Sequence, residues 1–363
     1  MTSKKIKTLI VDDSAVVRQV LSEILRSDRE IEIIAAASDP LIAMQYMQRQ
    51  WPDVIVLDLE MPRMDGLTFL KKLMNEHPTP VVVCSSLAEK GAAITVQVLA
   101  AGAVDVVTKP KLGVHGFLYD NKNNLIDVVK AASRANIRIL KRHADVANLL
   151  SPAPKLSVDA MIDPPKMLGS LKFNTERVIG IGASTGGTQA IEHILRSLPL
   201  QCPGVVIVQH MPAGFTKAFA DRLNTVCQIE VKEAEQGDRV QQGRAIISPG
   251  DKHMLLKRQG NQYSVELKDG PLINRHRPSV DVLFRSMAQS AGKNAVGVIL
   301  TGMGDDGARG LGEMHQAGAF CIAQNEETCV VYGMPKEAVK RGAADAILPI
   351  EAIAQHLLKA ELP

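Results

Sequence analysis

The 363-residue chain lacks a large excess of charge of either sign. Its formal net charge is only +3, and charged residues make up 22% of the sequence. A protein that binds nucleic acid through bulk electrostatics needs a strongly basic surface, because phosphates dominate that kind of affinity. The sequence also contains no helix-turn-helix pattern or basic recognition helix. We therefore expect no nucleic acid among its partners.

Cysteines are few, and their spacing follows no known pattern. They are odd in number and scattered, without a CxxC pair or metal-ligand spacing, at Cys84, Cys202, Cys227, Cys321 and Cys329. This distribution excludes a disulfide framework and a zinc site as the leading interpretations. We expect five small buried residues in a reducing compartment.

Long apolar runs are missing as well. At the start of the chain, only a few apolar residues separate the basic residues from Asp12 and Asp13, too few for the core of a signal peptide. No other stretch approaches the length that spans a membrane. We expect a cytoplasmic protein with no direct membrane insertion. Hydrophobic residues still make up 46% of the chain, and its length favours two domains.

Two series of strand and helix patterns divide the chain. Residues 1–135 alternate amphipathic segments with the β-branched runs TLIVDD, IEIIAAA, DVIVLDL, TPVVVCSS and VDVVTKP. Residues 173–363 contain further strand candidates in RVIGIGAS, GVVIVQH, RAIISPG and AVGVILTG. Residues 136–172 include a proline-rich segment without a sustained period, which indicates a linker. The sequence thus predicts two α/β domains, each with a doubly wound, mostly parallel sheet.

Ionisable and hydroxyl side chains follow the strands expected in the first domain. Asp12 and Asp13 come after TLIV, and Asp58 follows DVIVL. The last two runs end in Ser85 and Lys109. Ligands of such sheets bind at the carboxyl ends of the strands, and three carboxylates there would repel each other without a divalent cation. An isolated Asp13 could be only a helix cap, but the joint pattern predicts a site for Mg²⁺ and a phosphoryl group.

The combination DDS, LDLEMPRMDG, SS and TKP resembles the flavodoxin-like receiver domain of two-component response regulators, over residues 6 to 130. The resemblance implies that a histidine kinase phosphorylates Asp58. It also implies that Asp12, Asp13 and Asp58 hold Mg²⁺. Covalent transfer to a carboxylate, with a metal neutralising charge, is consistent with this chemistry.

The same resemblance assigns supporting roles to two other residues. Ser85 would sense the phosphoryl oxygen, and Lys109 would pair with it. This chain departs from the receiver pattern at Val106, because receivers usually carry an aromatic switch residue three positions before the lysine. Phosphorylation is still expected, but a switch that turns an aromatic ring is not.

The run VIGIGASTGGTQA places a glycine-rich turn after the first strand expected in the second domain. Its GASTG segment fits the GxSxG form of a nucleophile elbow, which would expose the hydroxyl of Ser184. The glycines also nearly fit a dinucleotide loop. A dinucleotide site would require an acidic residue at the end of the next strand, but GVVIVQH ends in Gln209 and His210.

A histidine at that strand end suits a serine nucleophile, because serine needs an imidazole to take its proton. Neighbouring parallel strands would bring Ser184 and His210 to one edge. The turn TGMGDDGARG offers Asp305 and Asp306 to orient the imidazole, and the backbone N–H of Met303 to face an oxyanion. The pattern predicts a Ser-His-Asp hydrolase. The alternatives are a histidine that merely ends a strand and a glycine loop that only reverses the chain.

Six motifs together resemble the Rossmann-like catalytic domain of the chemotaxis protein-glutamate methylesterases, the CheB family. They are IGASTGG, VQHMPAGFT, SPGDKHM, HRPSVDVLF, LTGMGDDGARG and QNEETCVVYGMP. The family pattern TGMGxDG implies that Asp306 is the catalytic aspartate and leaves Asp305 at a variable position. Thr185 and Met303 match family positions beside the nucleophile and at the oxyanion site.

The resemblance implies hydrolysis of glutamate γ-methyl esters, and deamidation of glutamines, on chemoreceptors. No cofactor would be needed for ester hydrolysis. Phosphorylation by the chemotaxis histidine kinase would activate the enzyme by loosening a receiver that otherwise packs over the esterase cleft. The alternative is a response regulator whose second half binds a nucleotide, with residues 182–187 holding its phosphate. A DNA-binding output is a weaker alternative.

Overall fold

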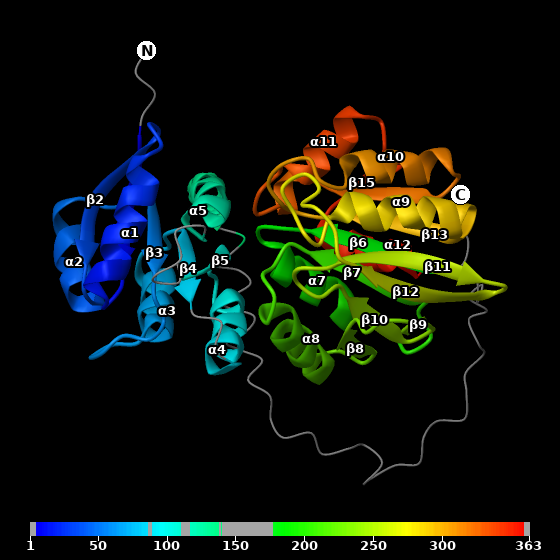
Figure 1. Cartoon of the computed structure of the whole chain (residues 1–363), viewed down its shortest axis with the longest axis horizontal. Helices are drawn as coiled ribbons and strands as arrows, with labels where there is room; N and C mark the ends of the chain where they lie inside the picture. Colours follow the sequence, from blue (N-terminus) through cyan, green and yellow to red (C-terminus); the bar gives the residue numbers. More distant parts are fainter. Residues whose placement is uncertain (1–4, 86–88, 110–116, 138, 140–176, 359–363) are drawn as a thin grey trace, which may run out of the picture.

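The computed structural model describes residues 5–85, 89–109, 117–137, 139 and 177–358. Within this part of the chain, two α/β domains pack against each other (Figure 1). The elements up to α5 form the first domain, and those from β6 onward form the second. Nearly all of the predicted linker, 136–172, lies outside the described residues.

The first domain contains a five-stranded parallel sheet of order β2-β1-β3-β4-β5. Its strands are β1 (Ile6–Val11), β2 (Ile31–Ala37), β3 (Val54–Leu57), β4 (Val81–Ser85) and β5 (Asp105–Thr108). Its helices are α1 (Ala15–Arg26), α2 (Pro40–Arg49), α3 (Gly66–Glu76), α4 (Glu89–Ala100) and α5 (Phe117–Ser133). All five predicted runs form strands. Strands β3 and β4 are buried along their whole length, as expected when helices cover both faces of a parallel sheet.

The first turn of α1 shows that Asp13 does not cap this helix. The N-cap residue is Ser14, whose hydroxyl accepts a hydrogen bond from the backbone N–H of Val17 at 3.4 Å. Asp13 is exposed at the carboxyl edge of the sheet. Helix capping therefore does not explain why an aspartate occupies this position.

The second domain contains a seven-stranded sheet of order β15-β14-β13-β6-β7-β10-β8, in which every pairing is parallel. Its strands are β6 (Val178–Ala183), β7 (Gly204–Gln209), β8 (Glu230–Glu233), β10 (Arg244–Ile247), β13 (Ala295–Ile299), β14 (Phe320–Gln324) and β15 (Ala346–Leu348). From β6 the chain first builds one side of the sheet and then returns to build the other. The carboxyl end of β6 is therefore a topological switch point, where ligands of such sheets bind.

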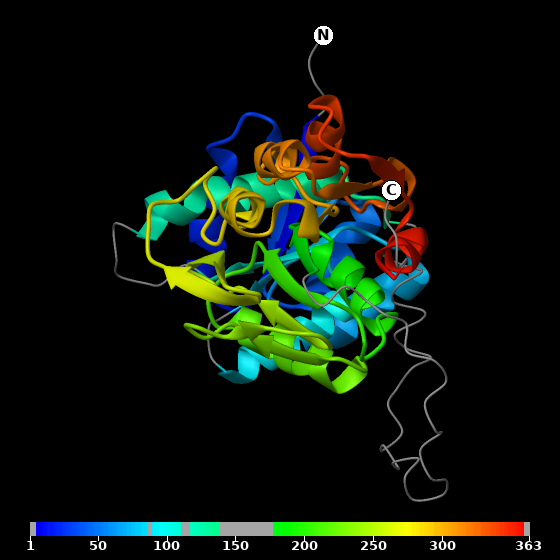
Figure 2. The ribbon, with the colours of Figure 1, turned by 90° about the vertical axis from the view of Figure 1, so that its right-hand side faces the viewer.

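Helices cover both faces of this sheet (Figure 2). One face carries α7 (Gly187–Arg196), α8 (Phe215–Val226) and α12 (Ile350–Leu357). The other face carries α9 (Val280–Ser290), α10 (Ala308–Gln316) and α11 (Met334–Lys340). A small antiparallel sheet that the sequence analysis did not predict packs against α9, with strands β9 (Arg239–Val240), β11 (His253–Gln259) and β12 (Gln262–Lys268).

Packing and hydrogen bonds join the two domains. Helix α4 packs against α7 and α8. The side-chain amide of Gln189 donates hydrogen bonds to the backbone carbonyls of Leu99, at 2.7 Å, and Ala103, at 3.3 Å. The backbone N–H of Asn136 donates to the carbonyl of Val330 at 3.0 Å. The first domain thus lies against the start of α7, the helix that follows the glycine-rich turn.

The structure bears on two expectations from composition. All five cysteines are free and buried, which confirms their interpretation as small core residues. Over the described part of the chain, no helix has both the length and the apolar character that crossing a membrane requires.

Candidate active site

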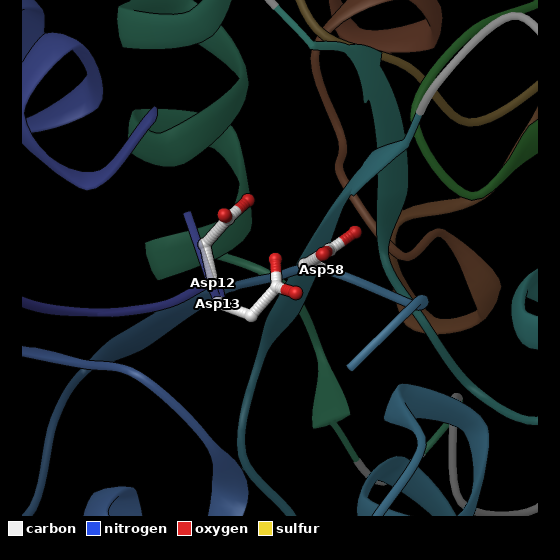
Figure 3. A group of neighbouring side chains, drawn as sticks. All are labelled: Asp12, Asp13 and Asp58. Atoms are coloured by element: carbon white, nitrogen blue, oxygen red, sulfur yellow. The ribbon is translucent and has the colours of Figure 1, made fainter. Parts of the chain in front are cut away.

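Three carboxylates meet at the carboxyl edge of the first sheet (Figure 3). Asp12 and Asp13 follow β1, and Asp58 follows the adjacent strand β3. One oxygen from each carboxylate lies within 4.8 Å of the other two. The ammonium of Lys109 lies 2.7 Å from Asp58 Oδ2 and 3.0 Å from Asp12 Oδ2. The structure therefore brings together all the predicted charged groups of this site.

The electrostatics of this cluster suit a divalent cation. Burial raises the pKa of Asp58, and the Asp12 charge adds to this, while Lys109 acts in the opposite direction. Burial alone would lower the pKa of Lys109, but its bonds to both carboxylates outweigh burial and raise it. Within the described structure, the buried Oδ2 atoms of Asp12 and Asp58 have no hydrogen-bond partner besides this ion contact. Such a set of hard oxygen ligands fits Mg²⁺.

The remaining predicted residues of the first domain lie at the neighbouring strand ends. Ser85 is buried at the end of β4, where its carbonyl accepts a hydrogen bond from the backbone N–H of Lys109 at 2.9 Å. Ser85 pairs in register with Thr108 of β5. Val106 is buried in the apolar core. Because its side chain is aliphatic, this position has no aromatic ring that could turn.

A tight turn presents Ser184 directly after β6. The Ser184 backbone N–H donates to the carbonyl of Thr301 at 3.0 Å, and its carbonyl accepts from Gly187 N–H at 2.7 Å. The side-chain amide of Gln209 donates to the same carbonyl at 2.9 Å. Gly186 has a φ of +78°, a conformation that glycine adopts without steric cost. Because the N–H groups of Ser184 and Gly187 are already paired, this turn is poorly suited to cradle a phosphate.

His210 occupies the position beside Ser184 on the neighbouring strand. Strands β6 and β7 are parallel, and Ala183 pairs with Gln209, so Ser184 and His210 are the next residues along the two strands. His210 Nε2 lies 2.8 Å from Asp306 Oδ2. Its Nδ1 atom is buried and has no hydrogen-bond partner among the described residues. With Nε2–H donated to Asp306, the Nδ1 lone pair is the one available to accept a proton.

Asp306 is a buried carboxylate in a dense set of donors. Its Oδ1 accepts from the hydroxyl of Ser279 and from the amide of Asn274, both at 2.8 Å, and its Oδ2 accepts from the backbone N–H of Val280 at 2.7 Å. Burial would raise the pKa of Asp306, but hydrogen bonds from His210, Asn274 and Ser279 hold it well below its usual range. The N-terminus of α9 also favours a negative charge here. Asp306 is thus built to remain ionised.

The other predicted residues of the second domain have different surroundings. Asp305 is exposed, and its nearest cation is Arg341 at 3.8 Å, so it does not share the network of Asp306. Met303 is half-buried and packs against an apolar cluster that includes side chains of the first domain. Thr185 is buried, and its hydroxyl donates to Asp105 Oδ2 of the first domain at 2.7 Å.

Several residues of the site carried no role in the sequence analysis. Asn274 and Ser279 hold Asp306, and the His276 ring stacks on His210 with centroids 3.6 Å apart and an interplanar angle of 9°. His276 and Ser279 both belong to the motif HRPSVDVLF, which was the available signal. Asp105 reaches the site from the other domain, and no local pattern in the sequence pointed to it.

Two family models match most of the chain. The model described as CheB methylesterase matches residues 179–357, and the response regulator receiver domain model matches residues 8–113. A Chromobacterium violaceum protein named protein-glutamate methylesterase/protein-glutamine glutaminase 2 is 58% identical over 356 residues, which cover 98% of this chain and 99% of that protein.

A second relative gives the same picture. A Photobacterium profundum protein-glutamate methylesterase/protein-glutamine glutaminase 1 is 60% identical over 96% of this chain and 99% of its own length. The crystal structure of the Thermotoga maritima CheB methylesterase catalytic domain is 42% identical to the matched part. It covers 50% of this chain and 97% of that chain, with a TM-score of 0.49.

Proposed function

This chain belongs to the CheB family of protein-glutamate methylesterases and protein-glutamine glutaminases that carry a receiver domain, and on that basis we propose a specific mechanism for it. The enzyme hydrolyses glutamate γ-methyl esters on the cytoplasmic helices of chemoreceptors with Ser184, His210 and Asp306. The observation that supports this proposal best is the 2.8 Å contact between His210 and the buried Asp306, next to the position of Ser184.

In the proposed reaction, the Ser184 hydroxyl oxygen attacks the ester carbonyl while His210 Nδ1 takes its proton. Asp306 stabilises the imidazolium that forms. His210 then returns the proton to the methoxide oxygen, methanol leaves, and an acyl-enzyme remains. Water, activated by the same imidazole, releases glutamate and restores the serine. Backbone N–H groups of the Thr185 and Met303 turns are proposed to stabilise the oxyanion, and deamidation of glutamine follows the same path with ammonia leaving.

We propose that phosphorylation of Asp58 by the chemotaxis histidine kinase activates this hydrolase. Asp12, Asp13 and Asp58 would hold Mg²⁺, which neutralises charge during phosphoryl transfer when bound. In the structure, the receiver contacts Thr185, the residue after the nucleophile, and Gln189, in the first turn of α7. Such contacts support a covered, less active arrangement that phosphorylation would loosen. We also propose that the receiver spans residues 1–135, the linker 136–172 and the catalytic domain 173–363.

Replacement of the nucleophile tests the reaction class. We expect Ser184→Ala to lower methanol release from methylated receptor membranes by about 10³-fold or more, because the variant lacks the hydroxyl that the proposed mechanism uses as its nucleophile. Ser197→Ala, at the exposed C-cap of α7, is the matched control and should retain full activity. Unchanged hydrolysis in Ser184→Ala would reject the mechanism and favour a nucleotide-binding second domain.

A further inference from the structure

A second histidine lies directly against the proposed base. His276 belongs to the segment between β12 and α9, far from His210 in sequence. Its ring is nearly parallel to the ring of His210, with a 9° interplanar angle and 3.6 Å between centroids. This is the distance of close ring-to-ring packing. The mechanism proposed above uses no atom of His276.

The hydrogen bond to Asp306 does not by itself fix the plane of the His210 ring. The torsion between Cβ and the ring of a histidine is broad, without narrow staggered minima. A hydrogen bond also tolerates departures of about 30° from linearity. Both tolerances allow Nδ1 to swing while Nε2 stays within reach of Asp306. A displacement of the base by about 1 Å can cost roughly a hundredfold in rate.

We propose that His276 is a positioning residue for the hydrolase. Its ring packs against one face of the His210 ring and holds Nδ1 in the direction of Ser184. This inference rests on the proposed function, because it requires His210 to act as the base.

The segment that carries His276 is itself well anchored. Ile273 and His276 exchange backbone hydrogen bonds of 2.8 and 3.0 Å, which close a tight turn. Within this turn, Asn274 and Arg275 have φ values of 50° and 70°, and the Asn274 amide bonds to Asp306 Oδ1 at 2.8 Å. The same short turn therefore holds the carboxylate and stacks a ring on the imidazole. It can fix both partners of the His210–Asp306 pair relative to each other.

A stacking partner for a catalytic imidazole must not carry a charge of its own. When His210 takes the serine proton, a second imidazolium at this distance would repel it. Burial, together with the neighbouring His210, lowers the pKa of His276 to about 3, so His276 is neutral at pH 7. A neutral ring beside a transient cation adds no charge repulsion. The stack can therefore position the ring without opposing proton transfer.

Three replacements in the full-length protein test this role. His276→Ala removes the ring, His276→Leu fills the space without a flat face, and His276→Phe keeps a flat, neutral ring. Methanol release is measured at varied concentrations of methylated receptor membranes, after acetyl phosphate and Mg²⁺ are added. We expect His276→Ala to lower kcat by about 10- to 100-fold with KM changed less than about twofold. His276→Phe should restore kcat to within about threefold of the parent protein.

The unfolding temperatures of all three variants separate positioning from stability. If His276→Ala fails to fold, the comparison of His276→Phe with His276→Leu replaces it, and Phe should exceed Leu by about tenfold in kcat. Full kcat in His276→Ala, or equal kcat in Phe and Leu variants of equal stability, would overturn the inference. Ser184→Ala in the same assay distinguishes the two proposals. If it is inactive while His276→Ala is fully active, only the positioning role fails.

Discussion

At the scale of single residues, two adjacent aspartates have contrasting environments. Asp306 is 1% exposed and accepts hydrogen bonds from His210, Asn274, Ser279 and the start of α9. Asp305 points to solvent, with only the distant contact to Arg341. Burying a charged carboxylate costs free energy unless hydrogen bonds compensate it. The many donors around Asp306 therefore indicate that its charge is required for function.

This contrast leads to a paired prediction. Asp306→Asn should lower kcat by about 10³- to 10⁴-fold, because an amide cannot stabilise the imidazolium and can favour the wrong tautomer. Asp305→Asn should stay within about twofold of the parent protein. Methanol release from methylated receptor membranes measures both. Equal losses in the two variants would show that the choice of Asp306 as the triad aspartate is wrong.

At the scale of elements, the turn between β6 and α7 combines a positive φ with close packing. A Cβ added at Gly186 would lie 2.5 Å from the Cβ of Val330, in addition to the strain of a φ of +78°. Gly237 has a similar φ of +84°, but a Cβ there would meet nothing within 4 Å. Alanine at Gly237 would therefore strain only the backbone, whereas alanine at Gly186 would strain the backbone and also overlap Val330.

We predict that Gly237→Ala costs about 1 kcal/mol, the usual penalty for a left-handed alanine, and leaves hydrolysis intact. Gly186→Ala should lower the calorimetric unfolding temperature of the second domain more. It should also reduce kcat by about tenfold or more, because relief of the overlap displaces Ser184, the proposed nucleophile. Equal unfolding temperatures for the two variants would mean that Val330 and the turn move apart at little energetic cost, which would contradict the prediction.

The same scale shows how far pattern recognition could reach. All nine strand candidates of the two predicted sheets form strands, because buried parallel strands are continuous β-branched runs. The hairpin β11–β12 was missed, although Met254, Leu256, Tyr263 and Val265 are buried at alternating positions. Leu255 lies between Met254 and Leu256, so β11 contains three consecutive apolar residues instead of alternating with polar ones, which obscured the period-two signal.

At the scale of the whole molecule, one half-buried carboxylate of the receiver contacts the catalytic domain. Asp105 Oδ2 accepts a hydrogen bond from the Thr185 hydroxyl at 2.7 Å, and removal of the Asp105 carboxyl group from water raises its pKa to about 6. If the receiver moves away, Asp105 becomes exposed and its pKa returns toward the ordinary 3.8. Between about pH 4 and pH 6, Asp105 is mostly ionised when the domains are apart and still mostly protonated when they are packed together. Loss of this proton favours the separated domains, so the packing of the receiver on the catalytic domain weakens as pH rises through this range.

This linkage predicts the pH dependence of inhibition. The ratio of unphosphorylated to acetyl phosphate-activated hydrolysis should rise between about pH 4 and pH 6 and then level off. Asp105→Asn keeps an acceptor for Thr185 without a charge, so its ratio should be lower at pH 7.5 and flat with pH. Asp58→Asn, which lacks the carboxylate proposed to accept the phosphoryl group, should not respond to acetyl phosphate. If unphosphorylated Asp105→Asn showed a larger share of its activated hydrolysis than the parent protein at pH 7.5, the Asp105 charge would not be what weakens the packing of the two domains.

The sequence by itself determined the parallel α/β character of both domains, the five strands of the first sheet and four of the seven strands of the second. It also determined the carboxylate cluster of the receiver and the order of serine, histidine and aspartate along the second domain. These features are local, because short runs of residues specify strand ends and glycine turns. Only the tertiary structure decided which distant groups surround them. The stacking of His276 on His210 and the contact of Asp105 with Thr185 join residues far apart in sequence. Contacts of this kind depend on how elements and domains pack, and no short run of sequence specifies that packing.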